Sequence, residues 1–222
     1  MEGLQLIVTA STIIIFILSA VLAASLSAEF MRGRKRSHLF WSAGMWLFAV
    51  TVLFEVIFAY GFYSALLIDA YLLLVAVLVE LLALGSMELT GNSAAKWAYG
   101  AFCIAATAFL AYALATSAVG NVIASYVVFG ALPLLVVEAS SIATFPAAAI
   151  LIIVAGVGYA RRRNPKMLSI IAGTVVVSIA GTLYIAAVPE FLYIAEFAGI
   201  VLLWLGFFDF SVLKRKGGQR KR

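Results

Sequence analysis

Four acidic residues lie inside long apolar stretches of this sequence and are the first candidates for chemistry: Glu55, Asp69, Glu80 and Glu196. Asp69 and Glu80 share the stretch Leu66–Glu88. They are eleven positions apart, about three helical turns, so a helix would place both carboxyl groups on nearly the same face. An ionisable side chain inside a bilayer-length helix is costly, and such a helix normally turns it away from lipid. We therefore expect the other helices to shelter this face.

The composition indicates a membrane protein. Of the 222 residues, 65% are hydrophobic and 11% are charged, and the mean hydropathy is +1.14. A soluble domain is closer to half apolar and a quarter charged. A helix needs roughly 20 apolar residues to cross a bilayer, so the chain has room for about seven spans. We predict an all-α bundle of seven transmembrane helices, a multi-pass protein of the cell membrane with no separate soluble domain.

Apolar runs and turn signals set the bounds of the predicted spans. These lie at about residues 4–28, 39–63, 66–88, 96–117, 138–160, 167–188 and 191–213. Gly130 and Pro133 interrupt residues 121–137, which we predict to be interfacial or re-entrant. The alternative, that these residues extend a tilted and kinked fifth helix, stays open. Residues 214–222 form a basic tail.

The positive charges predict the orientation of the bundle. All fifteen Lys and Arg residues fall in four places: Arg32–Arg36, Lys96, Arg161–Lys166 and Lys214–Arg222. Such residues near span ends stay cytoplasmic, and seven spans put all of them on one side. The N-terminus is then outside and the C-terminus inside. The clusters Arg32–Arg36 and Lys214–Arg222 would also attract anionic lipid headgroups, at roughly 1 kcal/mol per residue. The cytoplasmic face could dock a protein partner; nucleic-acid binding is not expected.

On this topology no Lys or Arg is available to pair with the acids toward the outer side, which are Glu55, Asp69, Glu138 and Glu196. These groups must be protonated, hydrogen-bonded to hydroxyls such as those of Tyr60 and Tyr71, or neutralised by a bound cation. One hypothesis is an outward-facing acidic cavity that accepts protons, a metal cation or a positively charged solute. In the alternative, each acid lies at the wet headgroup level or makes one interhelical hydrogen bond.

Other residues narrow the functional classes. Glu80 lies in the inner half of its span, where it could pass a proton from Asp69 or contact a basic loop. Trp41 and Trp97 are predicted to anchor the interface. The single cysteine, Cys103, excludes an intrachain disulfide, and a single histidine excludes bis-histidine haem. No phosphate loop or nucleophile motif is present, so we predict no cofactor and no enzyme activity. An integral-membrane lipid enzyme stays open as a third alternative, weakened by the missing motifs.

A seven-helix bundle with an outside N-terminus resembles the rhodopsin and transporter–opsin architecture. That family carries its retinal lysine in the middle of span seven. In Glu196-Phe-Ala-Gly-Ile200, an Asp-x-x-x-Lys pattern would place this lysine at position 200, where the sequence has isoleucine. No retinal is therefore expected. A second resemblance is to the seven-helix sensor regions that precede histidine kinases. It rests on Arg36-Ser-His-Leu-Phe-Trp-Ser-Ala-Gly-Met-Trp-Leu-Phe48 followed by Glu55, and on Leu84-Gly-Ser-Met-Glu-Leu-Thr-Gly91.

Two functional hypotheses follow from these observations. The first is a small proton- or cation-coupled transporter that uses Glu55, Asp69, Glu80 and Glu196. The alternative is a seven-helix membrane sensor or accessory subunit, which the second resemblance implies would pass its signal to a separate partner.

Overall fold

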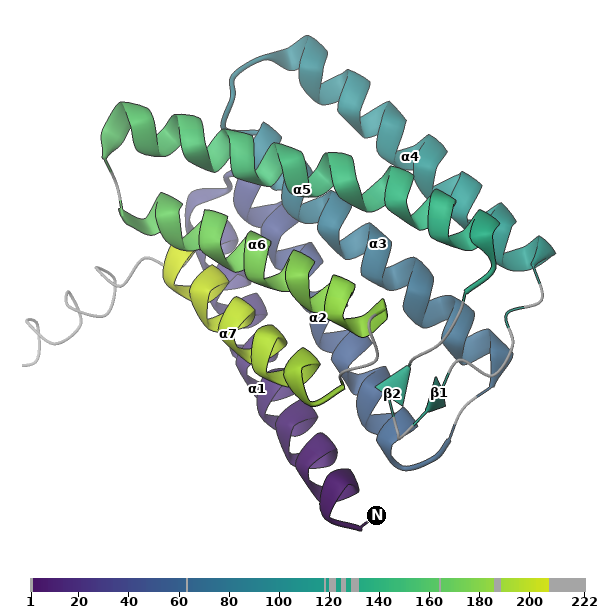
Figure 1. Cartoon of the computed structure of the whole chain (residues 1–222). Helices are drawn as coiled ribbons and strands as arrows, with labels where there is room; N and C mark the ends of the chain where they lie inside the picture. Colours follow the sequence, from purple (N-terminus) through teal and green to yellow (C-terminus); the bar gives the residue numbers. More distant parts are fainter. Residues whose placement is uncertain are drawn as a thin grey trace, which may run out of the picture.

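The computed structural model describes residues 2–62, 64–117, 119, 123–124, 127–128, 132–163, 165–185 and 189–207. The predicted tail 214–222, the ends of the last two predicted spans and much of segment 121–137 lie outside these residues. The described chain is helical apart from one short hairpin (Figure 1). Its helices are α1 (Glu2–Gly33), α2 (Arg36–Ala59), α3 (Ala65–Met87), α4 (Ser93–Thr116), α5 (Leu134–Arg162), α6 (Pro165–Ile185) and α7 (Pro189–Phe207).

Five of the described helices, α1 to α5, are long and apolar enough to cross a membrane. The described apolar parts of α6 and α7 are shorter, Pro165–Val176 and Ile194–Phe207. The prediction of an all-α membrane fold is therefore confirmed at the level of helix content, length and composition.

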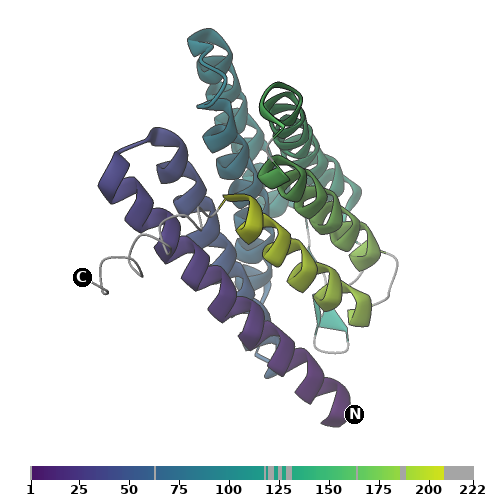
Figure 2. The same ribbon diagram turned by 90° about the vertical axis from the view of Figure 1, so that its left-hand side faces the viewer.

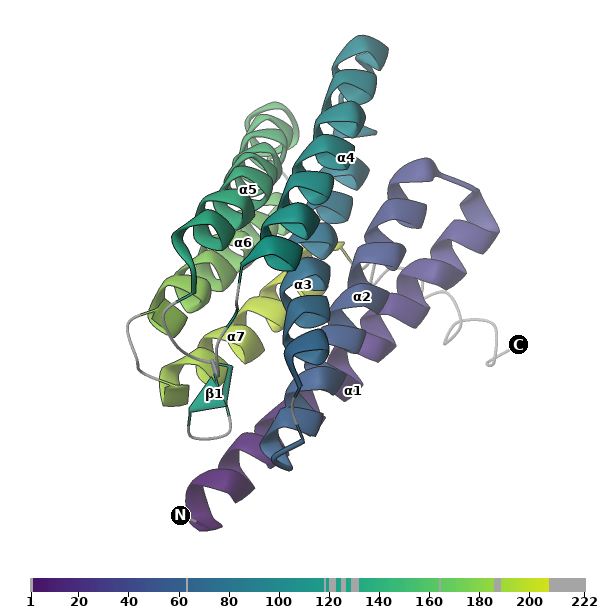
Figure 3. The ribbon, with the colours of Figure 1, turned by 90° about the vertical axis from the view of Figure 1, so that its right-hand side faces the viewer.

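The helices form an antiparallel bundle. The α1–α2 and α5–α6 connections turn in the same way: Arg34 and Arg163 adopt positive φ values of 45° and 50°. Each donates its backbone N–H to the carbonyl four residues earlier, at 2.7 Å. Figure 2 shows α7 lying between α1 and α6. The α1–α2, α3–α4 and α5–α6 connections lie at one end of the bundle, and the N-terminus lies at the other (Figure 3).

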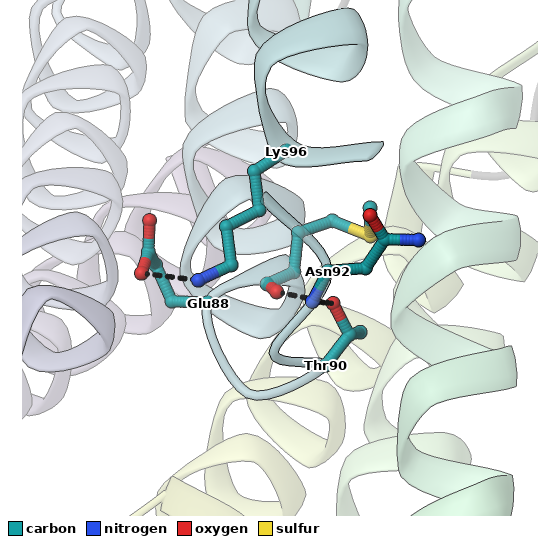
Figure 4. Close-up of polar contacts among 5 residues, drawn as sticks. Glu88, Thr90, Asn92 and Lys96 are labelled. Carbon is teal, nitrogen blue, oxygen red and sulfur yellow. Dashed lines mark hydrogen bonds and ion pairs between the residues drawn. The ribbon is translucent and has the colours of Figure 1, made fainter. Parts of the chain in front are cut away.

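The α3–α4 connection is held by short-range polar contacts (Figure 4). Gly91 takes a φ of 73°, which L-residues rarely adopt. The Asn92 side chain caps α4 by accepting a hydrogen bond from the Ala95 N–H at 3.1 Å. Lys96 Nζ pairs with Glu88 Oε2 at 3.0 Å across the turn. The turn signal visible in the sequence therefore corresponds to a capped, closed turn.

Part of the segment predicted to be interfacial or re-entrant forms a hairpin. Strands β1 (Ile123–Ala124) and β2 (Val127–Val128) pair antiparallel, with Ile123 opposite Val128. The hairpin lies at the same end of the bundle as the N-terminus, where β2 contacts α2 (Figure 1). Helix α5 begins at Leu134, four residues before the expected start, because Pro133 suits a position just before a helix. Within the segment 121–137, the extended fifth helix therefore covers residues 134–137.

Glycines allow α2 and α3 to pack closely. A Cβ at Gly85 would overlap the indole ring of Trp41 and lie 3.0 Å from the Ser37 carbonyl oxygen. Trp41 is only 7% exposed, and its Nε1 donates to the Leu82 carbonyl at 3.2 Å. The expectation that Trp41 anchors the interface is therefore wrong, because the space left by Gly85 admits the ring into the core. Trp97 is 79% exposed, as an interface anchor requires.

Substituting Gly85 by Ala should destabilise the α2–α3 pair. The added methyl group displaces Trp41 and weakens its hydrogen bond, at a cost of about 1–3 kcal/mol. We expect a fall of roughly 3–10 °C in the apparent melting temperature of detergent-purified protein. Gly156→Ala on α5 is the matched control, because no side-chain or tertiary atom lies within 4 Å of its Cβ position. Equal melting temperatures for the two variants would contradict this packing.

Candidate functional site

Glu55 is buried between α2 and α3. It lies four residues before the end of α2 and is 7% exposed. Its Oε1 accepts a hydrogen bond from the Tyr71 hydroxyl at 2.7 Å. The ring of Phe58, one turn after Glu55 toward the end of α2, meets Tyr71 edge-on at 5.7 Å between centroids. The sequence brings these groups together because a short connection, with Ser64 capping α3, returns the chain alongside α2.

Glu196 reaches the same level from α7. Ile200, Leu203 and Phe207 follow it at helical spacing, and all three are buried. At the other end of this face, the ring centroids of Phe207 and Trp41 are 4.7 Å apart. Since α2 and α7 run in opposite directions, this contact brings Glu55 and Glu196 to similar depths. Glu196 lies within electrostatic reach of Glu55.

Each member of this carboxyl pair, Glu55 and Glu196, has one oxygen without a partner. In both residues Oε2 is shielded from solvent and makes no hydrogen bond within the described chain. The ion pairs found among the described residues, Glu29–His38 and Glu88–Lys96, belong to the connections at the opposite end. Burying an ionised group without compensation is expensive, so the pair requires a proton or a bound cation. The site can therefore bind positive charge.

Glu80 belongs to a separate cluster between α3 and α4. It is 2% exposed, and its Oε2 accepts from the Thr107 hydroxyl at 2.7 Å. Tyr99 and Cys103 lie near Glu80. Together with Thr107 they recur every four residues along one face of α4. Sequence reasoning did not identify this polar stripe of α4, although its spacing was visible.

The other predicted site residues do not join the carboxyl pair. Asp69 is partly buried, and its Oδ1 lacks a hydrogen bond within the described chain. It shares a face of α3 with Glu80, as expected from their spacing, whereas Tyr71 lies on nearly the opposite face. Tyr60 is 59% exposed and Glu138 is also exposed. The structure thus brings together Glu55, Tyr71 and Glu196, and leaves the remaining candidates apart.

The composition of the pair limits the cations that suit it. Among the described residues, no group of three or more His, Cys, Asp and Glu side chains could hold a metal ion. Two carboxyl groups and one hydroxyl remain. This set is better matched to a proton, a monovalent ion or an organic cation than to a divalent metal that needs a fuller oxygen shell.

Comparisons with protein-family models, with curated proteins and with solved structures each gave no match to this chain.

The Tyr71→Phe substitution tests the hydrogen bond to Glu55. Removing the hydroxyl leaves a second oxygen of Glu55 without a partner, so we expect a loss of roughly 0.5–2 kcal/mol in stability. Tyr60→Phe is the control, because the Tyr60 side chain is exposed at the end of α2. The comparison is between apparent melting temperatures in detergent at neutral pH. If the Tyr71→Phe and Tyr60→Phe variants have the same melting temperature, the hydrogen bond from Tyr71 to Glu55 contributes nothing to stability.

Proposed function

We propose that this chain is a seven-span membrane transporter that moves a cation in exchange for protons or another cation. The observation that carries the proposal is the carboxyl pair: two acids on different helices, each with one shielded oxygen that has no partner within the described chain, and one hydroxyl bonded to Glu55. A residue pair that must take up positive charge is suited to bind a cation and a proton alternately. Ionisable groups at membrane depth commonly mark ion and proton pathways.

The distribution of charge supports seven spans with the N-terminus outside. The basic α1–α2 and α5–α6 connections and the turn before Lys96 lie at one end of the bundle, and the sequence contains no Lys or Arg in the connections of the other end. Short basic connections stay in the cytoplasm. The carboxyl pair then belongs to the outer half, with Glu55 about 6 Å from the end of α2 and Glu196 about 10 Å from the start of α7, at 1.5 Å per residue.

Cysteine labelling checks this orientation. In a Cys103→Ser background, a single cysteine replaces either Phe62 or Leu89, which are both exposed and lie at opposite ends of α3. A membrane-impermeant maleimide should label Phe62→Cys in intact cells and Leu89→Cys only after permeabilisation. The reverse labelling pattern would show that the orientation is opposite to the proposed one. Labelling of both positions in intact cells would show that α3 does not span the membrane.

The burial of both unpartnered oxygens supports an occluded state, with the site closed to either side. The hairpin contacts α2 at the proposed outer end of the bundle. In the transport cycle, a cation would displace the proton from the pair, and reprotonation would release the cation on the other side.

The basic connections support a second part of the proposal, contact with anionic lipids. Residues 32–36, four of which are Arg or Lys, are all exposed at the end of α1 and the start of α2. Headgroups with negative charge would be attracted to them at the cytoplasmic surface.

Flux through reconstituted protein tests the transporter. Liposomes containing a pH-sensitive dye receive an inward gradient of Na⁺, K⁺ or tetramethylammonium, and internal pH is followed. We expect alkalinisation above empty liposomes, reduced at least about tenfold by Glu55→Gln or Glu196→Gln at cation concentrations below saturation, since loss of 1.4 kcal/mol in binding weakens the affinity tenfold. Glu138→Gln is the control, being the same change at an exposed acid. Flux that survives in both pair variants would refute the site.

A further inference from the structure

A groove runs along the seam between α1 and α7. Two successive hollows form it, of about 240 Å³ and about 110 Å³. Residues of the first are Ser11, Ile14, Ile15, Ile194 and Phe197. Residues of the second are Leu18, Val21, Ile200, Val201 and Trp204. On each helix the lining residues recur at intervals of three and four, so each helix contributes one stripe to the groove wall, which is apolar apart from Ser11.

The groove passes close to Glu196 on α7. Its first hollow is bounded by Ile194 and Phe197, which flank Glu196 in sequence. Ile200 lines the second hollow and lies one turn after Glu196, about 40° away around the helix. Glu196 itself is partly exposed, whereas its Oε2 is shielded and unpartnered. Glu196 shares its helix face with the buried Leu203 and Phe207, so the acid lies on the core side of the groove and lines neither hollow.

On the proposed seven-span topology the groove would open toward the bilayer. Its rim residues Ile14, Ile194 and Phe197 are 50%, 65% and 44% exposed, and they lie on apolar helices. A solute that enters here must first dissolve among acyl chains. It must also carry positive charge, because the adjoining acids have unpartnered oxygens and no described cation. Phe197 and Trp204 offer aromatic faces for such a charge.

We propose that the substrate of the carboxyl pair is an amphipathic organic cation, with a bulky apolar body and a single positive charge, which enters laterally from the lipid between α1 and α7. The inference rests on the proposed transport function and specifies its substrate class. The apolar body occupies the groove, and the charge lies between Glu55 and Glu196. Binding displaces a proton from the pair, so the cation and the proton move in opposite directions and charge is conserved within the site.

Binding of tetraphenylphosphonium to the purified full chain tests this class. We expect saturable binding in equilibrium dialysis, at least tenfold tighter than binding of tetramethylammonium, which has the charge without the apolar body. Glu196→Gln should weaken tetraphenylphosphonium binding at least tenfold. Ile14→Trp should do the same by filling the groove. Ile13→Trp is the matched control, because Ile13 is 40% exposed on α1 and does not line the groove.

The outcomes separate this inference from the transport proposal. Flux of Na⁺ or tetramethylammonium that depends on Glu55 and Glu196, without tetraphenylphosphonium binding, overturns the substrate class and leaves the transporter standing. Equal weakening by Ile14→Trp and Ile13→Trp, or no weakening by either, overturns the lateral route. If neither the flux of small cations nor the binding of tetraphenylphosphonium depends on Glu55 and Glu196, both proposals fail.

Discussion

The interaction on which the site depends is the approach of two acids, Glu55 and Glu196, in a region without a positive side chain. One hydrogen bond from Tyr71 returns only about 1 kcal/mol, whereas an unpartnered buried charge costs several. Packing must therefore hold the acids in place: Phe58 against Tyr71 on one side, and the buried face of α7 on the other. A ligand that neutralises the pair relieves a cost that the fold itself imposes.

Helix α3 divides the polar interior into two parts. Its face toward α2 presents Tyr71 to the carboxyl pair, and its face toward α4 presents Glu80 to Thr107. Asp69 lies on the second face, three turns before Glu80. A proton path along α3 would thus connect Asp69 with Glu80 and bypass Glu55. The four acids are better described as a pair with two separate neighbours than as one cavity.

Sequence reasoning predicted the helices better than the site. The bounds of α3, predicted at 66–88 and found at Ala65–Met87, follow from local signals: Ser64 as a cap and Gly91 in the next turn. The start of α5 at Leu134 falls between the two alternatives for residues 121–137, because Pro133 precedes the helix and does not interrupt it. Which acids meet depends on how α7 packs, and Gly173 and Gly206, which allow its close approach to α6, carry no distinctive sequence signal.

The seam between α1 and α7 differs physically from its neighbours. Short connections join α1 to α2 and α6 to α7, and these limit how far each pair can separate. The α1 and α7 helices are the first and the last of the described bundle, so no short connection restrains them. Their contact is apolar at the groove, and separating apolar surfaces within lipid costs little because acyl chains replace the lost contacts. On the proposed function, the bundle would therefore open most readily along this seam, where the proposed cation would enter from the lipid.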